Sequence, residues 1–219
     1  MYQVGDFNKV DTIAVLCRGK SLSYVKKSND FDYCYTVGEF TNALKSLLPL
    51  LKGKTIVPII NKSATKLNKK LSLRAGILDI QCNFTGWKDL PISAPRQRLY
   101  NQIRKSNSWA KVHLAPPGIR DNRPQDKNGP VKWNTTGLYA VDLAAFWKPR
   151  EILIYGLDFY SVPYWKKESI DASWKKNMRR RSAMLHNFNA IVRRDLDISF
   201  KIFTYCKVKS ANNVTVVRL

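Results

Sequence analysis

The sequence predicts an α/β fold in which one domain, residues 1–219, is built on a mostly parallel sheet. Apolar, β-branched runs of strand length alternate along the chain with segments whose apolar residues recur at helical spacing. The strand-length runs are apolar throughout, which is typical of parallel strands covered by helices on both faces. The length suits one large domain, and no internal repeat interrupts the pattern.

Seven runs are predicted to form the strands, and three segments the helices. The strands are Thr12–Cys17, Thr55–Ile60, Ala75–Gln81, Lys111–Ala115, Glu151–Tyr155, Phe200–Cys206 and Val214–Val217. The helices are Val37–Leu51, Gly137–Trp147 and Ala183–Leu196.

Two long segments do not fit this alternation. Trp87–Pro130 is rich in proline, arginine, asparagine and glycine, and Ser161–Arg181 is basic and aromatic without a clean period. Long irregular segments in a compact domain are usually functional loops. Because ligands of open α/β sheets bind beyond the carboxyl ends of the strands, we expect residues 161–181, which follow the strand ending at Tyr155, to form a basic lid.

The charge balance predicts an anionic partner. The chain has 38 basic and 16 acidic residues, a net charge of +22, which suits nucleic acid, a membrane surface or a phosphate-bearing small molecule. No run approaches the ~18 apolar residues that span a bilayer, and the N-terminus is polar, so we expect a cytoplasmic protein with peripheral membrane association as an alternative. The four cysteines are widely separated, which favours buried, reduced thiols over disulfides or a zinc site.

Two glycine-containing turns are candidate ligand sites. Gly19 and Ser21 follow the first strand, where backbone N–H groups can approach a phosphate; an ordinary strand-to-helix turn is the alternative. Thr135, Thr136 and Gly137 open a predicted helix, where they either cap it or let a ligand approach its N-terminus. Neither turn has the spacing of a dinucleotide fingerprint or a P-loop.

A third candidate begins where the strand Glu151–Tyr155 breaks at Gly156. Tyr160 and Tyr164 follow within the run Gly-Leu-Asp-Phe-Tyr-Ser-Val-Pro-Tyr. Phenol hydroxyls at a strand's carboxyl end can donate to phosphate oxygens, or the rings can simply pack at a loop edge.

The order of these motifs resembles the bacterial sialyltransferases of glycosyltransferase family 42. The resemblance is carried by Thr-Thr-Gly-Leu-Tyr-Ala-Val from Thr135 and by Glu-Ile-Leu-Ile-Tyr-Gly-Leu-Asp-Phe-Tyr from Glu151 to Tyr160. The match is good over Asn134–Tyr164 and fair over Ile13–Leu22 and His186–Cys206. It implies a Rossmann-like domain of the GT-A variant that transfers sialic acid from CMP-sialic acid to a glycan hydroxyl by an inverting displacement, without metal or cofactor.

The resemblance also implies roles for single residues. Tyr160 and Tyr164 fall on the tyrosines that stabilise the departing phosphate, and His186 falls on the general base. Asn61 falls on a donor-binding asparagine, and Thr135, Thr136 and Gly137 fall on the residues that hold nucleotide and sugar carboxylate. Of the two histidines, His113 lies in a short strand pattern, where a structural role is expected.

The chain departs from the family's pattern after the first strand, and two other interpretations stay open. Arg18 stands where the family has a donor-site asparagine. One alternative is a nucleic-acid-binding protein, because tryptophan and tyrosine alternate with lysine near residues 164–176. The other is a relative of the family that has lost catalysis. An oligomer is compatible with all three interpretations.

Overall fold

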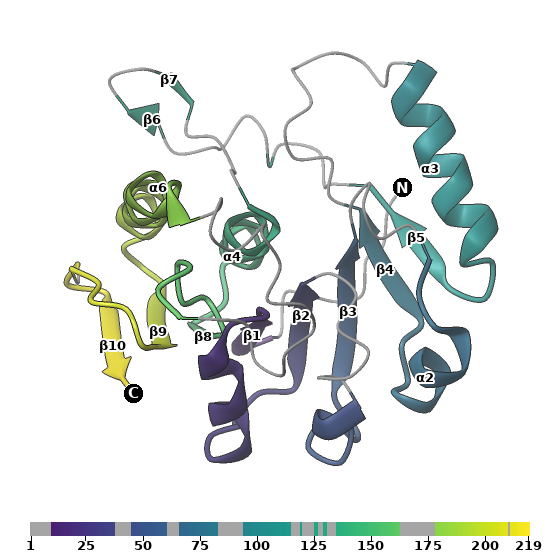
Figure 1. Cartoon of the computed structure of the whole chain (residues 1–219), viewed down its shortest axis with the longest axis horizontal. Coiled ribbons are helices and arrows are strands. Elements are labelled where there is room, and N and C mark those ends of the chain that lie inside the picture. The colour runs from purple at the N-terminus through teal and green to yellow at the C-terminus, as the bar shows by residue number, and fades with distance from the viewer. Residues whose placement is uncertain are drawn as a thin grey trace.

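The computed structural model describes residues 10–37, 45–60, 66–82, 94–114, 119, 125–126, 129–130, 135–162, 178–209 and 211–219. In these residues eight strands form one sheet in the order β10-β9-β8-β1-β2-β3-β4-β5, shown in Figure 1. The strands are β1 (Thr12–Leu16), β2 (Tyr33–Val37), β3 (Thr55–Ile60), β4 (Asp79–Cys82), β5 (Lys111–His113), β8 (Glu151–Tyr155), β9 (Ser199–Thr204) and β10 (Val214–Arg218). The helices are η2 (Lys20–Lys26), α2 (Lys69–Arg74), α3 (Ala94–Ser106), α4 (Thr136–Phe146) and α6 (Arg181–Arg194), and β6 (Gln125–Asp126) pairs with β7 (Gly129–Pro130) as a separate ribbon.

The sheet confirms the predicted α/β class, because every pairing within it is parallel. β1 lies at its centre, where Ile13 pairs with Tyr33 of β2 on one side and Ile152 of β8 on the other. The chain builds the sheet outward from β1 to β5, then returns to β8 and proceeds to β10 at the opposite edge. The strand order therefore reverses between β1 and β8, and the carboxyl ends at such a reversal are where open α/β sheets bind ligands.

Two hydrophobic clusters hold the sheet between its helices, as Figure 1 shows for α4 and α6 on one side of β1 and η2 on the other. Helix α4 is buried from Gly137 to Ala145, which explains why its sequence is apolar on all sides. The second cluster joins Leu22 and Val25 of η2 to Tyr155 and Phe203 of the sheet. Because α4 is fixed by both the sheet and α6, its N-terminus is a rigid part of the sheet's carboxyl edge.

Three sequence predictions need correction. The predicted strand Ala75–Gln81 is β4, Asp79–Cys82, because Ala75 caps α2 and Gly76, at φ 69°, ends that helix. Ala94–Ser106 of the predicted irregular segment forms α3, and Tyr33–Val37, absent from the predicted strands, forms β2.

Most other predicted boundaries agree with the structure to within about two residues. For the predicted helix Val37–Leu51, Val37 belongs to β2, residues 45–47 are helical, and residues 38–44 lie outside the described part. Of the predicted lid, residues 163–177 also lie outside it. All four cysteines are buried and unpaired, as expected. None of the helices in the described residues is both long and apolar enough to span a bilayer.

Candidate functional site

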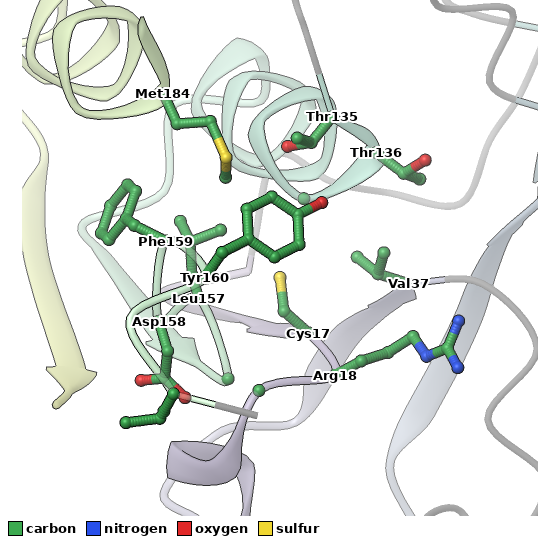
Figure 2. A pocket seen from close by; sticks show the side chains of 14 residues that line it. Cys17, Arg18, Val37, Thr135, Thr136, Leu157, Asp158, Phe159, Tyr160 and Met184 are labelled. Atoms are coloured by element: carbon green, nitrogen blue, oxygen red, sulfur yellow. The ribbon is translucent and has the colours of Figure 1, made fainter. Parts of the chain in front are cut away.

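A pocket of about 170 Å³ opens at the carboxyl ends of β1, β2 and β8, beside the reversal of strand order. Figure 2 shows its side chains entering from the two turns after β1 and β8, from the start of α4 and from α6. The lining residues are Cys17, Arg18, Gly19, Val37, Thr135, Thr136, Gly137, Gly156, Leu157, Asp158, Phe159, Tyr160, Val162 and Met184.

Asp158 connects the backbone segments that form the floor of this pocket. Its Oδ2 accepts from the backbone N–H of Ser21 at 2.9 Å, and its Oδ1 accepts from the Thr204 hydroxyl at 3.1 Å and the Tyr205 N–H at 3.2 Å. The side chain is only 3% exposed. Buried carboxylates persist in proteins when donors surround them, so Asp158 joins the turns after β1, β8 and β9 rather than offering its oxygens to a ligand.

The turns after β1 and β8 lie unusually close to each other. Gly19 donates its N–H to the carbonyl of Gly156 at 2.8 Å, and Gly156 donates its N–H to Ser21 Oγ at 2.9 Å. A Cβ on Gly19 would lie 2.4 Å from Asp158 Oδ2, and one on Gly156 would lie 2.5 Å from the Cys17 carbonyl. Both positions therefore need glycine for this backbone contact, and Gly156 also needs it for its φ of 72°.

Helix α4 begins at the pocket wall. Thr135 is its N-cap, and the Thr135 hydroxyl accepts from the N–H of Leu138 at 3.2 Å. A Cβ on Gly137 would lie 3.0 Å from Leu157 and 3.1 Å from Cys17 Sγ, so this glycine lets the helix pack tightly against the two turns. The first N–H groups of the helix and the positive end of its dipole consequently border the pocket.

Tyr160 is held at the pocket in an unfavourable backbone conformation. Phe159 and Tyr160 have φ values of 47° and 57°, a region that costs a non-glycine residue on the order of 1–3 kcal/mol. Phe159 is buried and packs edge-on against Phe188 of α6 at a ring separation of 5.6 Å, which fixes the turn. Figure 2 shows the Tyr160 ring standing in the pocket between Cys17 and the start of α4.

The polar groups that line the pocket favour an anion. Thr136 and Tyr160 bring hydroxyls, the start of α4 brings N–H groups, and Arg18 lines the pocket at the β1 turn, with its guanidinium extended away from Tyr160 (Figure 2). Burial, and secondarily the charge of Asp158, raise the pKa of the Cys17 thiol well above its usual range, so this thiol stays protonated near neutral pH. Asp158 is the one carboxylate among the described lining residues, and the three donors named above engage its oxygens.

The structure brings most of the predicted site residues together. Gly19, Thr135, Thr136, Gly137, Gly156 and Tyr160 all line the pocket, and Ser21 lies in its floor. Asn61 and Tyr164 fall outside the described residues.

The two histidines lie apart from this group. His113 of β5 is paired with Asp79 at 2.6 Å, in keeping with its predicted structural role. His186 is exposed on the second turn of α6. Met184, two residues earlier on the same helix, lines the pocket, and two residues correspond to about 200° around a helix. His186 therefore occupies the opposite side of α6 from Met184.

The sequence pattern does not single out Asp158, although the Gly-Leu-Asp-Phe-Tyr block contains it. The donors to Asp158 come from residues 137, 46 and 47 positions away, so local sequence pattern could not have identified them. An aspartate directly after a buried strand was the available signal.

Comparisons with solved structures find bacterial sialyltransferases. Cst-I, a monofunctional α-2,3-sialyltransferase of Campylobacter jejuni, matches with a TM-score of 0.53 at 15% identity, over 94% of this chain and 79% of that chain. The sialyltransferase CstII of the same organism, solved with the substrate analogue CMP-3FNeuAc, matches at 0.49 and 14% identity, over 88% of this chain and 80% of that chain. At this identity, the likeness to Cst-I shows a shared fold.

No protein-family model and no curated protein matches the sequence. In the described ranges, the histidine, cysteine, aspartate and glutamate side chains form no group of three or more suited to hold a metal ion.

Proposed function

We propose that this protein is a glycosyltransferase of the sialyltransferase kind, which transfers a sugar acid from a CMP-activated donor to a glycan hydroxyl with inversion. The observation that carries the proposal is the pocket at the β1–β8 reversal, where Tyr160, the start of α4 and the turn that carries Arg18 meet. The shared fold with Cst-I supports the choice of this transferase class over other users of anionic ligands.

The leaving group is the part of this reaction for which the pocket is best equipped. When the bond between the anomeric carbon and the CMP phosphate breaks, its electron pair goes to the phosphate oxygen, whose negative charge increases. Donors already aimed at that position stabilise the transition state without reorganising. The Tyr160 hydroxyl, the N–H groups of the first turn of α4 and the Arg18 guanidinium are of the right type, and the proposal needs no divalent ion to do this work.

The strained turn at Tyr160 supports the same role. Backbone strain persists only where the surrounding structure overdetermines it, and it gathers at sites where a side chain must be positioned. Here Phe159 is anchored against Phe188, and Asp158 is anchored to Ser21 and Thr204, so the two residues that precede Tyr160 are both fixed.

For the acceptor, the proposal uses His186 as the general base. With His113 engaged by Asp79, His186 is the chain's other imidazole, and an imidazole is the group whose usual pKa lies near neutral pH. The base removes the proton of the acceptor hydroxyl as the oxygen attacks the anomeric carbon. Since His186 lies on the far side of α6 from Met184, this role requires the start of α6 to turn when both substrates are bound.

The test is release of CMP from CMP-N-acetylneuraminate, followed by chromatography with and without a neutral acceptor such as lactose. We expect CMP release that continues in excess EDTA and that a Tyr160→Phe variant slows. CMP release that stops with EDTA and returns with manganese would overturn the metal-independent mechanism, and no CMP release under any condition would overturn the proposed donor.

A further inference from the structure

The charged side chains around the pocket are distributed unevenly. Their distribution points to the kind of acceptor, an inference that rests on the proposed function. We propose that the acceptor is an acidic glycan, whose carboxylate or phosphate groups are bound by a cationic rim beside the donor pocket. The cationic rim consists of the exposed side chains Lys20, Arg179, Arg180, Lys207 and Lys209.

Each part of the cationic rim continues from a segment that builds the pocket. Lys20 directly follows Gly19, and its ammonium lies 5.1 Å from the centre of the Tyr205 ring, while the Tyr205 N–H binds Asp158 in the pocket floor. Lys207 and Lys209 follow Tyr205 on the same loop.

Arg179 and Arg180 are connected to the loop of Lys207 and Lys209 through the first residue of α6. Arg179 and Arg180 precede α6, whose first residue, Arg181, donates to Cys206 Sγ at 3.1 Å. Met184, one turn further on, lines the pocket. The rim is thus a continuation of the pocket wall and not a set of unrelated surface charges.

In the described turns after β1, β8 and β9, and in the described residues that open α4 and α6, the one acidic side chain is the buried Asp158. The other acidic residues of the sheet and its helices lie just before a strand or at its first residue, or pair with Arg194 near the end of α6. They are Asp11, Asp30, Asp32, Asp79, Asp142, Glu151, Asp195 and Asp197, and Asp126 belongs to the separate β6–β7 ribbon. The amino ends of the strands therefore carry both signs of charge, whereas the exposed charges on the described segments beside the pocket are all positive, and such a field attracts and orients anions.

The donor does not account for the cationic rim. The proposed position of the donor phosphate lies inside the pocket, between Arg18 and the start of α4, and none of the five rim side chains belongs to the described lining. An acceptor, in contrast, approaches from outside the pocket, and the rim side chains stand on segments that continue from the pocket lining. Acidic groups on the acceptor would then gain several exposed charge pairs, each of modest strength.

The rim's other features favour a glycan over nucleic acid or a membrane surface. Single-stranded nucleic acid binds through open aromatic faces, but Lys20 already stacks over the Tyr205 ring. Binding within a membrane surface uses apolar side chains, but of the exposed large ones that the structure describes, Leu73, Leu78 and Leu196 lie near the amino ends of strands and only Met178 lies beside the rim.

The test measures binding of a fluorescent hyaluronan octasaccharide, an acidic glycan, in the absence of any nucleotide, with a neutral maltooctaose as comparison. The rim variant is Arg179→Gln/Arg180→Gln/Lys207→Gln, and the matched control, Lys52→Gln/Arg74→Gln/Arg193→Gln, removes three exposed charges near the amino ends of strands. We expect the wild type to bind the acidic glycan over the neutral one, and the rim variant to lose about tenfold in affinity while the control loses little.

Equal losses in the rim variant and the control would overturn the proposal, because binding would then follow net charge alone. A stronger preference for a short oligothymidylate, or for phosphatidylglycerol vesicles over phosphatidylcholine vesicles, would overturn it in favour of nucleic acid or a membrane surface. CMP binding is measured in parallel on each variant. Retained glycan binding with no CMP binding would count against the proposed donor only, so the two failures are distinguishable.

Discussion

The carboxylate of Asp158 accepts the backbone N–H of Ser21 at 2.9 Å, although the two residues are 137 positions apart in the chain. This bond joins the turn after β1 to the turn after β8, the two neighbouring strands at which the strand order reverses. The pocket exists because these turns are held together, so its shape depends on a buried carboxylate whose oxygens are engaged by three protein donors.

Replacing Asp158 with asparagine should therefore destabilise the fold. Both carboxylate oxygens accept hydrogen bonds, and an amide NH₂ in place of one oxygen would face a donor with another donor. We expect Asp158→Asn to lower the free energy of unfolding by about 1–3 kcal/mol in urea titrations. Asp11→Asn, at an exposed position, serves as the control. Equal stability of both variants would show that Asp158 does not hold the turns together.

Gly19→Ala should be more damaging than substitution at an open glycine. The added methyl group would meet Asp158 Oδ2 at 2.4 Å and the Gly156 carbonyl at 2.5 Å, so the two turns must separate. We expect loss of CMP binding together with a lowered melting temperature. At Gly53 nothing lies within 4 Å, and Gly53→Ala meets only the strain of its φ of 81°, about 1 kcal/mol. The two variants are compared by thermal unfolding and by titration with CMP.

Tyr160→Phe should reduce catalysis without unfolding the protein. The ring and its strained backbone are retained, while the hydroxyl proposed to donate to the leaving phosphate is lost. Removal of one such donor typically costs about 10²–10³ in kcat. The check is kcat for CMP release, with the melting temperature measured beside it. An unchanged kcat would remove Tyr160 from the mechanism.

The two histidines should respond differently to substitution. His186→Ala should slow transfer to the acceptor by about 10²–10⁴, the usual effect of losing a general base, with CMP affinity unchanged. His113→Ala should instead reduce stability, because it breaks the 2.6 Å contact with Asp79 between β4 and β5. The measurements are single-turnover transfer and urea unfolding. Full transfer by His186→Ala would mean that the base lies elsewhere.

Much of the fold could be predicted because it depends on local pattern. The uninterrupted apolar runs of β1 and β8 identify buried parallel strands, and the Thr-Thr-Gly start of α4 identifies a capped helix. The sequence gives little sign of helix α3, because Pro95 stands in its first turn and Ile103 is its one fully buried residue among those with described side chains. The run Tyr33–Val37 is rich in strand-favouring residues, so the sequence does carry a signal for β2; its partner is tertiary, because the Tyr35 hydroxyl accepts from Trp147 Nε1 at 3.0 Å.

The site could be predicted in part for the same reason. Glycines and threonines at strand and helix ends are visible locally, and they do meet at the pocket. The contacts of Asp158, the left-handed backbone of Tyr160 and the position of His186 on α6 arise from tertiary packing and have no local signature.

Thermal unfolding in the presence of CMP, CDP, UDP and GDP tests the central claim most directly, because it asks whether the pocket binds the nucleotide that the proposed donor carries. At about one hundred times its dissociation constant a ligand stabilises the fold by about 2.7 kcal/mol, which for a chain of this size raises the melting temperature by roughly 5–10 °C. We expect CMP to give a shift of this size, UDP and GDP to give smaller ones, and Arg18→Gln to reduce the CMP shift. Equal shifts for all four nucleotides, or no shift with CMP, would contradict the proposed function.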